Sequence, residues 1–134
     1  GIENRLGYFA YYRVEVKFRN QTQAGPNSFN HTSSRLPALY NITAFVADRG
    51  VWTMPLTFSL DYGYNETLSL VEFHSLRLND VVLNLTGYTA AWNTLRDEFF
   101  CAPFFELWIR NTSTGDFEYH ERFLSLSLNM TVVI

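Results

Sequence analysis

Apolar and polar residues alternate along most of this chain, and this period of two limits its possible folds more than any other feature of the sequence. The run YRVEVKFR at residues 12–19 shows the pattern most clearly, because apolar and charged side chains alternate strictly. Successive side chains of a β-strand point to opposite faces, whereas a helix repeats its apolar positions every three or four residues. The run therefore predicts a half-buried strand with its charges facing solvent.

Similar patterns predict strands along the rest of the chain. The expected strands cover residues 39–46, 52–60, 67–78, 81–85, 104–110 and 117–133, with turns at 48–50, 61–66, 79–80 and 111–116. Residues 20–38 are rich in Gly, Pro, Ser, Asn and Thr, so we expect a long loop there. After Gly87 the alternation breaks, and residues 89–99 are the one segment that suits a short helix.

Short strands that are separated by frequent turns are typical of two packed antiparallel sheets. We therefore expect an all-β fold, a two-sheet antiparallel β-sandwich of the immunoglobulin or jelly-roll type. It should have about seven to nine strands and one short helix around residues 89–99. The chain of 134 residues fits a single domain over residues 1–134.

The composition excludes several classes of protein. Hydrophobic residues make up 47% of the chain and charged residues only 17%, where an ordinary soluble domain has roughly 25% charge. Such a chain has enough apolar side chains for a core, which excludes intrinsic disorder. A net charge of -3 with a pI near 5.5 argues against nucleic acid as the main partner.

Potential N-glycosylation sites are frequent in this chain and could provide the surface polarity that its few charged residues do not. Seven of the asparagines occur in the motif Asn-x-Ser/Thr, where roughly two such motifs are expected by chance. Glycans add bulky polar mass without charge, so they would keep an apolar surface in water. The predicted acceptors are Asn20, Asn30, Asn41, Asn65, Asn84, Asn111 and Asn129.

The expected strands also predict where these asparagines point. Asn84 and Asn129 are out of phase with the apolar residues around them, so both should face outward. Asn41 shares its parity with Leu39 and Phe45, so either its strand has a looser register or this site carries no glycan. The other acceptors fall in loops or at strand ends. The alternative interpretation is that Asn and Thr simply form turns and edge strands.

Glycosylation places the chain outside the cytosol, at the cell surface or in the extracellular medium. Small secreted animal domains usually contain disulfides, but Cys101 is the only cysteine, so an archaeal surface protein fits better. No stretch approaches the about 20 apolar residues of a membrane-spanning helix. Because no signal peptide begins at Gly1, we read the chain as a mature form.

The sequence has no recognisable motif for catalysis, and we expect no enzyme. The usual nucleophile, zinc-protease and phosphate-loop motifs do not occur. The three histidines, His31, His74 and His120, are far apart in sequence, and we expect no metal or other cofactor besides covalent N-glycans. The adjacent acids at 97–98 are interpreted as a helix surface.

Two further residue sets leave alternatives open. Asp48, Asp61 and Asp80 lie in expected turns and would form a calcium site only if those turns converged at one end of the sandwich. Cys101 lies in the run FFCAPFF at residues 99–105. Burial among aromatic rings is the main interpretation of this cysteine, and an intermolecular disulfide is the alternative.

The runs YRVEVKFRN at residues 12–20 and FELWIR at residues 105–110 resemble extracellular β-sandwich domains of an archaeal family of unknown function. Those domains pair an opening Tyr-x-Val-x-Val strand with a late strand that ends in Leu-Trp-Ile-like residues. The resemblance implies an extracellular β-sandwich and no catalytic residues. The uncharged C-terminal stretch is in addition similar to the donor strands of pilin-like filament subunits.

Two functional hypotheses follow. In the first, the chain is a structural subunit of an extracellular, N-glycosylated filament or surface assembly that polymerises by β-strand addition, and its partners are copies of itself. Residues 123–134 or residues 1–12 would be the segment inserted into the neighbouring subunit. In the second, it is a monomeric cell-surface binding module for glycans or another surface protein, with exposed aromatic side chains as its binding surface.

Overall fold

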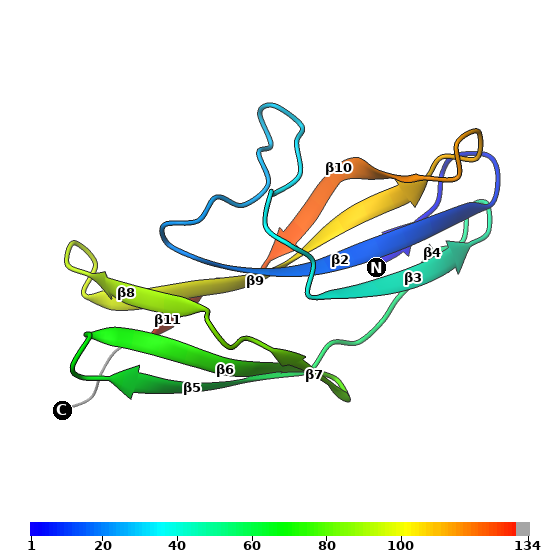
Figure 1. Cartoon of the computed structure of the whole chain (residues 1–134). Helices are drawn as coiled ribbons and strands as arrows, with labels where there is room; N and C mark the ends of the chain where they lie inside the picture. Colours follow the sequence, from blue (N-terminus) through cyan, green and yellow to red (C-terminus); the bar gives the residue numbers. More distant parts are fainter. Residues whose placement is uncertain (131–134) are drawn as a thin grey trace.

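The computed structural model describes residues 1–130, which form antiparallel strands joined by turns and one long loop (Figure 1). The prediction of an all-β, antiparallel chain is confirmed. No helix occurs in the described range, and hence none there that could cross a membrane. The strands are β1 (Ile2–Glu3), β2 (Ala10–Asn20), β3 (Tyr40–Val46), β4 (Val51–Trp52), β5 (Phe58–Asn65), β6 (Leu70–Leu78), β7 (Val81–Asn84), β8 (Thr89–Asn93), β9 (Glu98–Arg110), β10 (Phe117–Ser125) and β11 (Leu128–Met130).

Strand β9 is the centre of the large sheet. Nine strands belong to this sheet, and its main path runs β3-β2-β9-β8-β6-β5. Strands β10 and β11 also pair with β9, and β7 pairs with β6. Strands β1 and β4 form a separate two-stranded sheet. The strand with 13 residues therefore has four different partners along its length.

The large sheet turns back over its own apolar face. Strand β8 pairs both with the start of β9 and with β6, so β5, β6 and β7 lie opposite the layer of β2, β3 and β9 (Figure 1). Phe18 from β2 and Phe73 from β6 meet between these layers, with ring centroids 4.9 Å apart. Both are buried in one cluster together with Phe99 and Leu85. This cluster explains why the alternating pattern recurs along the whole chain.

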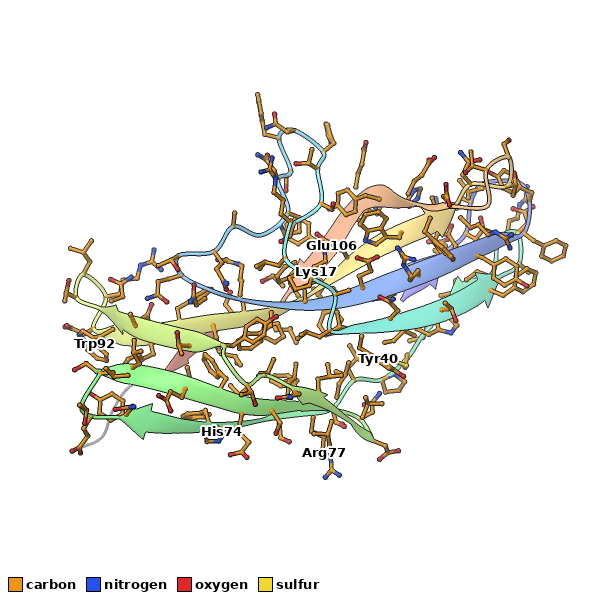
Figure 2. The ribbon with its side chains drawn as sticks, in the orientation of Figure 1. Lys17, Tyr40, His74, Arg77, Trp92 and Glu106 are labelled. Atoms are coloured by element: carbon orange, nitrogen blue, oxygen red, sulfur yellow. The ribbon has the colours of Figure 1, made fainter. Side chains whose placement is uncertain are left out.

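The charged face of β2 departs from the prediction of a half-buried strand. Tyr12, Val16 and Phe18 face the core as expected, but Glu15 and Lys17 on the opposite face are also buried. The loop at residues 21–39 rises from this face and covers it (Figures 1 and 2). The predicted solvent-facing charges were therefore wrong at these two positions, because alternation along one strand does not show what a distant loop covers.

The short helix predicted around residues 89–99 is wrong. Residues 89–93 form β8, whose Ala90 is buried and lies opposite Val71 of β6. Residues 94–97 make a turn in which the Asn93 Oδ1 atom accepts hydrogen bonds from the Leu95 and Arg96 backbone N–H groups. Residues 89–91 pair with β6 and residues 92–93 pair with β9, so each residue of β8 has a partner in the sheet and tertiary pairing outweighs the local propensity.

Several strand boundaries also differ from the prediction, and the expected strand at residues 52–60 is interrupted at residues 53–57. The expected turn at residues 61–66 is wrong, because β5 continues to Asn65 with one register shift between Asp61 and Tyr62. The expected strand at residues 117–133 divides into β10 and β11, and residues 131–133 lie outside the described range. The turns at residues 79–80 and 111–116 are confirmed.

Pro103 accounts for the division of the last strand. It lies within β9, which pairs on both sides, although proline is usually confined to edge strands and bulges. Its carbonyl accepts the Leu126 N–H at 3.0 Å, so its backbone faces β10 and β11, and it has no N–H to donate in return. Ladder pairing is interrupted at this point, between Ser125 and Leu128.

The burial of Cys101 predicts how its thiol reacts. The residue is fully buried in the core, which confirms the main interpretation, and burial raises the pKa of the thiol to about 12. Because the thiolate is the reactive form, a disulfide reagent at mildly alkaline pH should leave the folded protein unmodified and label one thiol per chain after unfolding in guanidinium chloride. Rapid labelling of the folded protein would contradict this burial.

Candidate interaction surface on the edge strand β3

Strand β3 presents an open edge without the features that usually protect one. It ends the main path of the large sheet, and within residues 1–130 it pairs only with β2. All seven of its residues pair in continuous register, from Tyr40 opposite Val16 to Val46 opposite Ala10. The strand YNITAFV has no charged residue and no proline. Natural edge strands normally use charges, prolines or bulges to prevent pairing with another chain, so β3 is a candidate surface for strand addition.

The other long edge strands carry such protection. Strand β5 has a bulge between Asp61 and Tyr62, and Asp61 adds a charge there. Strand β10 has a larger irregularity between Tyr119 and Arg122, and it carries the charged side chains of Glu118, Glu121 and Arg122. Among the long edges of the described sheet, β3 is therefore the one best suited to receive a strand.

A cluster of exposed aromatic rings lies beside the end of β3. Phe45 on β3 and Phe9 stack with ring centroids 5.3 Å apart and an interplanar angle of 18°. Tyr11 on β2 packs against the same Phe45 ring at 4.7 Å. These rings are between 48% and 63% exposed. Together with Tyr8 they border a hollow of about 320 Å³, and we call these four residues the aromatic cluster.

A buried ion pair joins the outer faces of β2 and β9. The Lys17 ammonium lies 2.6 Å from the Glu106 Oε1 atom, and neither side chain is more than 4% exposed (Figure 2). Both side chains also bind Ser34 of the long loop. Lys17 donates a hydrogen bond to the Ser34 carbonyl at 2.8 Å, and the Ser34 N–H donates to the Glu106 Oε2 atom at 2.6 Å. The pair therefore fastens the loop to the sheet.

Aromatic rings and a second ion pair extend this buried cluster. The Lys17 Nζ atom lies 5.9 Å from the centroid of the Trp108 ring, and the Arg13 guanidinium lies 5.5 Å from the same ring. Arg13 also forms an ion pair with Glu15 at 2.5 Å. Sequence reasoning missed this cluster. The available signal was Glu106, a single charge within the apolar run of residues 104–109.

The structure places the predicted glycosylation sites in two groups. Three acceptors, Asn30, Asn41 and Asn84, have exposed side chains. Three others are partly buried and donate a hydrogen bond from Nδ2, Asn20 to the Thr89 carbonyl and Asn65 and Asn111 to glutamate side chains. Asn129 lies in β11, but the predicted outward direction of its side chain falls outside what the structure describes.

Asn41 faces solvent, which fits the first alternative given for it, a strand register looser than the parity with Leu39 suggests. Its side chain is exposed, and so is Phe45 on the same face of β3, at 52%. Leu39 does pack against the core, but it precedes the strand. The phase therefore changes between Leu39 and Tyr40, and parity counted from Leu39 gives the wrong face for every later residue.

Asparagine also shapes the turns of this chain. The Asn20, Asn84 and Asn111 Oδ1 atoms each accept the backbone N–H of the residue two positions later, at 2.9 Å. This is the Asx-turn arrangement, which mimics a backbone turn. The Thr22 hydroxyl adds a hydrogen bond of 2.8 Å to Asn20 Oδ1. Several acceptors therefore hold turns in addition to occupying the glycosylation motif.

Both terminal segments pair within their own chain. Strand β1 pairs with β4 through Ile2 and Glu3, and the buried Asn4 side chain donates to the Tyr8 and Val46 carbonyls. At the other end, β10 and β11 pair with β9. A terminal segment donated to another copy would first have to leave these partners.

The other candidate residues do not converge. His31 and His74 each lie near a single carboxylate, Glu121 and Asp61 respectively, at 3.5 Å. Burial, followed by the positive charge of Arg122, lowers the pKa of His120. Within residues 1–130, no three His, Cys, Asp or Glu side chains come close enough to hold a metal ion, so the calcium alternative at 48, 61 and 80 is not seen.

Comparison of the chain with protein-family models, with curated proteins and with solved structures returns no match.

The buried pair predicts a specific pattern of stability. Replacing Lys17 by Met leaves the Glu106 charge buried without its partner, which should lower the free energy of unfolding by about 3–5 kcal/mol. Adding Glu106→Gln removes that charge but keeps an acceptor for the Ser34 N–H, so the double variant should regain at least half of the loss. Urea unfolding measures both values.

The exposed pair of Glu3 and Arg5, with a contact of 2.9 Å, is the matched control. Glu3→Gln should change the free energy of unfolding by less than about 1 kcal/mol, because exposed ion pairs contribute little. A Lys17→Met loss as small as this control, or a double variant less stable than Lys17→Met alone, would contradict the account.

Proposed function

We propose that this chain is a structural subunit of an extracellular, N-glycosylated filament or surface assembly whose copies join by β-strand addition. The observation that carries this proposal is the β3 edge, which is continuous in register, uncharged and, in the part of the chain that the structure describes, paired on one side only. A strand added there would satisfy the free backbone N–H and C=O groups of β3. In this proposal the bent large sheet acts as a β-sandwich, with β3 at the open edge of one layer.

A filament requires a second, different surface on each copy. If β3 paired with β3 of another copy, the contact would close into a dimer, whereas a different donor segment propagates without closing. Residues 1–12 and 123–134 remain the donor candidates. Release of residues 1–12 would break the pairing of β1 with β4 and of Ala10, Tyr11 and Tyr12 with β3. Release of the C-terminal segment would break the pairing of β10 and β11 with β9, so either donor has to give up strand pairing within its own chain first.

The glycosylation motifs support the extracellular part of the proposal. Asn30, Asn41 and Asn84 are exposed and can accept a glycan without moving the backbone. Many large apolar side chains are exposed as well, including Phe29 at 91% and Leu95 at 96%. Covalent glycans would cover part of this surface. We propose an archaeal cell surface as the location, and copies of the chain with other surface components as partners.

A charge on the β3 edge should prevent assembly. Thr43 is exposed in the middle of β3, so Thr43→Glu places a carboxylate on the edge without touching the core. Thr43→Gln is the matched control, because the glutamine side chain has nearly the same shape as glutamate but carries no charge. Both variants lose the glycosylation motif at Asn41, so the comparison isolates the effect of charge.

Light scattering and negative-stain electron microscopy measure the outcome. We expect polymers from the unmodified chain and from Thr43→Gln, and monomers from Thr43→Glu. Intact mass before and after deglycosylation reports how many acceptors carry a glycan. Monodisperse monomers of the unmodified chain, or equal polymerisation of the Glu and Gln variants, would reject strand addition at β3.

The aromatic cluster favours a second candidate function, a monomeric cell-surface binding module for glycans or another surface protein. Phe9, Tyr11 and Phe45 offer ring faces to solvent beside a hollow, which is an arrangement that stacks on sugar rings. Arg110 and Thr112 also line this hollow and supply polar groups.

Removal of one ring tests this second function. If the aromatic cluster binds sugars, Phe45→Ala should weaken binding on a glycan array about tenfold, given the contribution of one buried aromatic ring. Phe29→Ala is the control, because Phe29 is exposed in the long loop outside the cluster. Absence of glycan binding by the unmodified chain, or equal effects of the two variants, would exclude the aromatic cluster as a sugar site.

A further inference from the structure

An apolar groove opens between the inner face of the central strands and the segment that follows β4. Its volume is about 260 Å³, slightly below the roughly 300–1,000 Å³ that is usual for small-molecule sites. Phe105 and Leu107 of β9 and Leu124 of β10 form one wall, and Trp52, Met54 and Leu56 form the other. We call this space the apolar groove.

A second, more polar hollow adjoins the apolar groove. It has a volume of about 520 Å³ and is bordered by Arg5, Tyr12 and His120. Leu107 and Arg122 line both spaces, so Arg122 stands where the apolar groove meets the polar hollow. In the ladder Arg122 lies opposite Leu107, and Leu124 lies opposite Phe105, which places both β10 side chains on the groove side.

Arg122 is a cation without a partner in the described part of the chain. Arg5, the other arginine of the polar hollow, pairs with Glu3 at 2.9 Å. No ion pair or hydrogen bond of the Arg122 side chain occurs within residues 1–130. Its positive charge nevertheless acts on His120, which borders the same polar hollow. Burial is the main cause of the lowered pKa of His120, and the Arg122 charge is the second.

We propose that this site binds an amphipathic carboxylate, a medium-chain fatty acid anion, with its alkyl chain in the apolar groove and its carboxylate on Arg122. The guanidinium presents two parallel N–H donors, which match the two oxygens of a carboxylate. The lining of the groove is mostly apolar, so the alkyl chain would contact mainly hydrocarbon side chains there. The charge complementarity is specific, because an amphiphile with a cationic head would meet the like charge of Arg122.

Isothermal titration calorimetry with a series of fatty acid anions tests the proposal. Hexanoate, octanoate and decanoate are titrated below their micelle-forming concentrations. The affinity should rise by up to about fourfold per added methylene until the groove is full. Decyltrimethylammonium, which has the same chain and the opposite charge, should bind at least tenfold more weakly than decanoate. Equal affinity for these two amphiphiles, or no dependence on chain length, would overturn the proposal.

Substitutions at Arg122 separate ligand recognition from a purely structural role of the charge. Arg122→Gln should weaken decanoate binding tenfold or more, whereas Arg122→Lys keeps a positive charge and should weaken it less. Arg77→Gln is the control, because Arg77 is exposed on β6, outside both hollows (Figure 2). Circular dichroism verifies that each variant is folded.

Two results would show that Arg122 and the apolar groove serve a different purpose. A charge that points inward from an edge strand is one of the features that prevent pairing with another chain, and it need not bind a ligand. In that case Arg122→Gln would aggregate while its remaining monomer bound decanoate as before, and the proposal would be wrong. The proposal would also be wrong if monomers bound no decanoate and the groove were occupied only by a strand of another copy in polymers.

Discussion

The fold depends on β9, which pairs with four other strands and also binds the long loop through Glu106. It pairs with β2 along one edge, with β10 and β11 along the other, and with β8 at its start. Two residues within it set the local structure around them. Pro103 lacks an N–H and coincides with the division of the last strand, and Glu106 brings a negative charge into a closed environment.

The Glu106 charge determines how the rest of the layer is arranged. A carboxylate with 0% exposure requires a cation and hydrogen-bond donors nearby. Lys17 from β2 supplies the cation, and the Ser34 N–H supplies a donor from the long loop. The loop therefore covers the outer face of β2, while the opposite face packs against β6 in the core. Strand β3 remains at the side of this layer, with one edge free.

The sequence predicts the parts of this structure that depend on local pattern. Alternation in residues 12–19 correctly identifies the core face of β2, because a strand displays its period of two wherever one face is buried. The helix predicted around residues 89–99 is wrong because β8 obtains its stability from pairing with β6 and β9, which lie elsewhere in the sequence. Lys17 and Glu106 are 89 positions apart in the numbering, and no local pattern connects them.

The candidate surface was predicted less well than the fold. The sequence identified the terminal segments and Asn41 as features of interest, but it left open which way Asn41 points. The free edge of β3 is a property of sheet order, which follows from tertiary pairing and is not encoded in the strand itself. The absence of charge in residues 40–46 was visible in the sequence. Its meaning appears only once the strand is known to lie at an edge.

Hydrogen exchange of the β3 amides tests the central claim most directly. Amides at a free edge exchange quickly, and pairing with an added strand slows them. The account predicts that peptides covering residues 40–46 become strongly protected when monomers assemble, while those covering β5 and β10 change little. Assemblies in which residues 40–46 exchange as fast as they do in the monomer would contradict it.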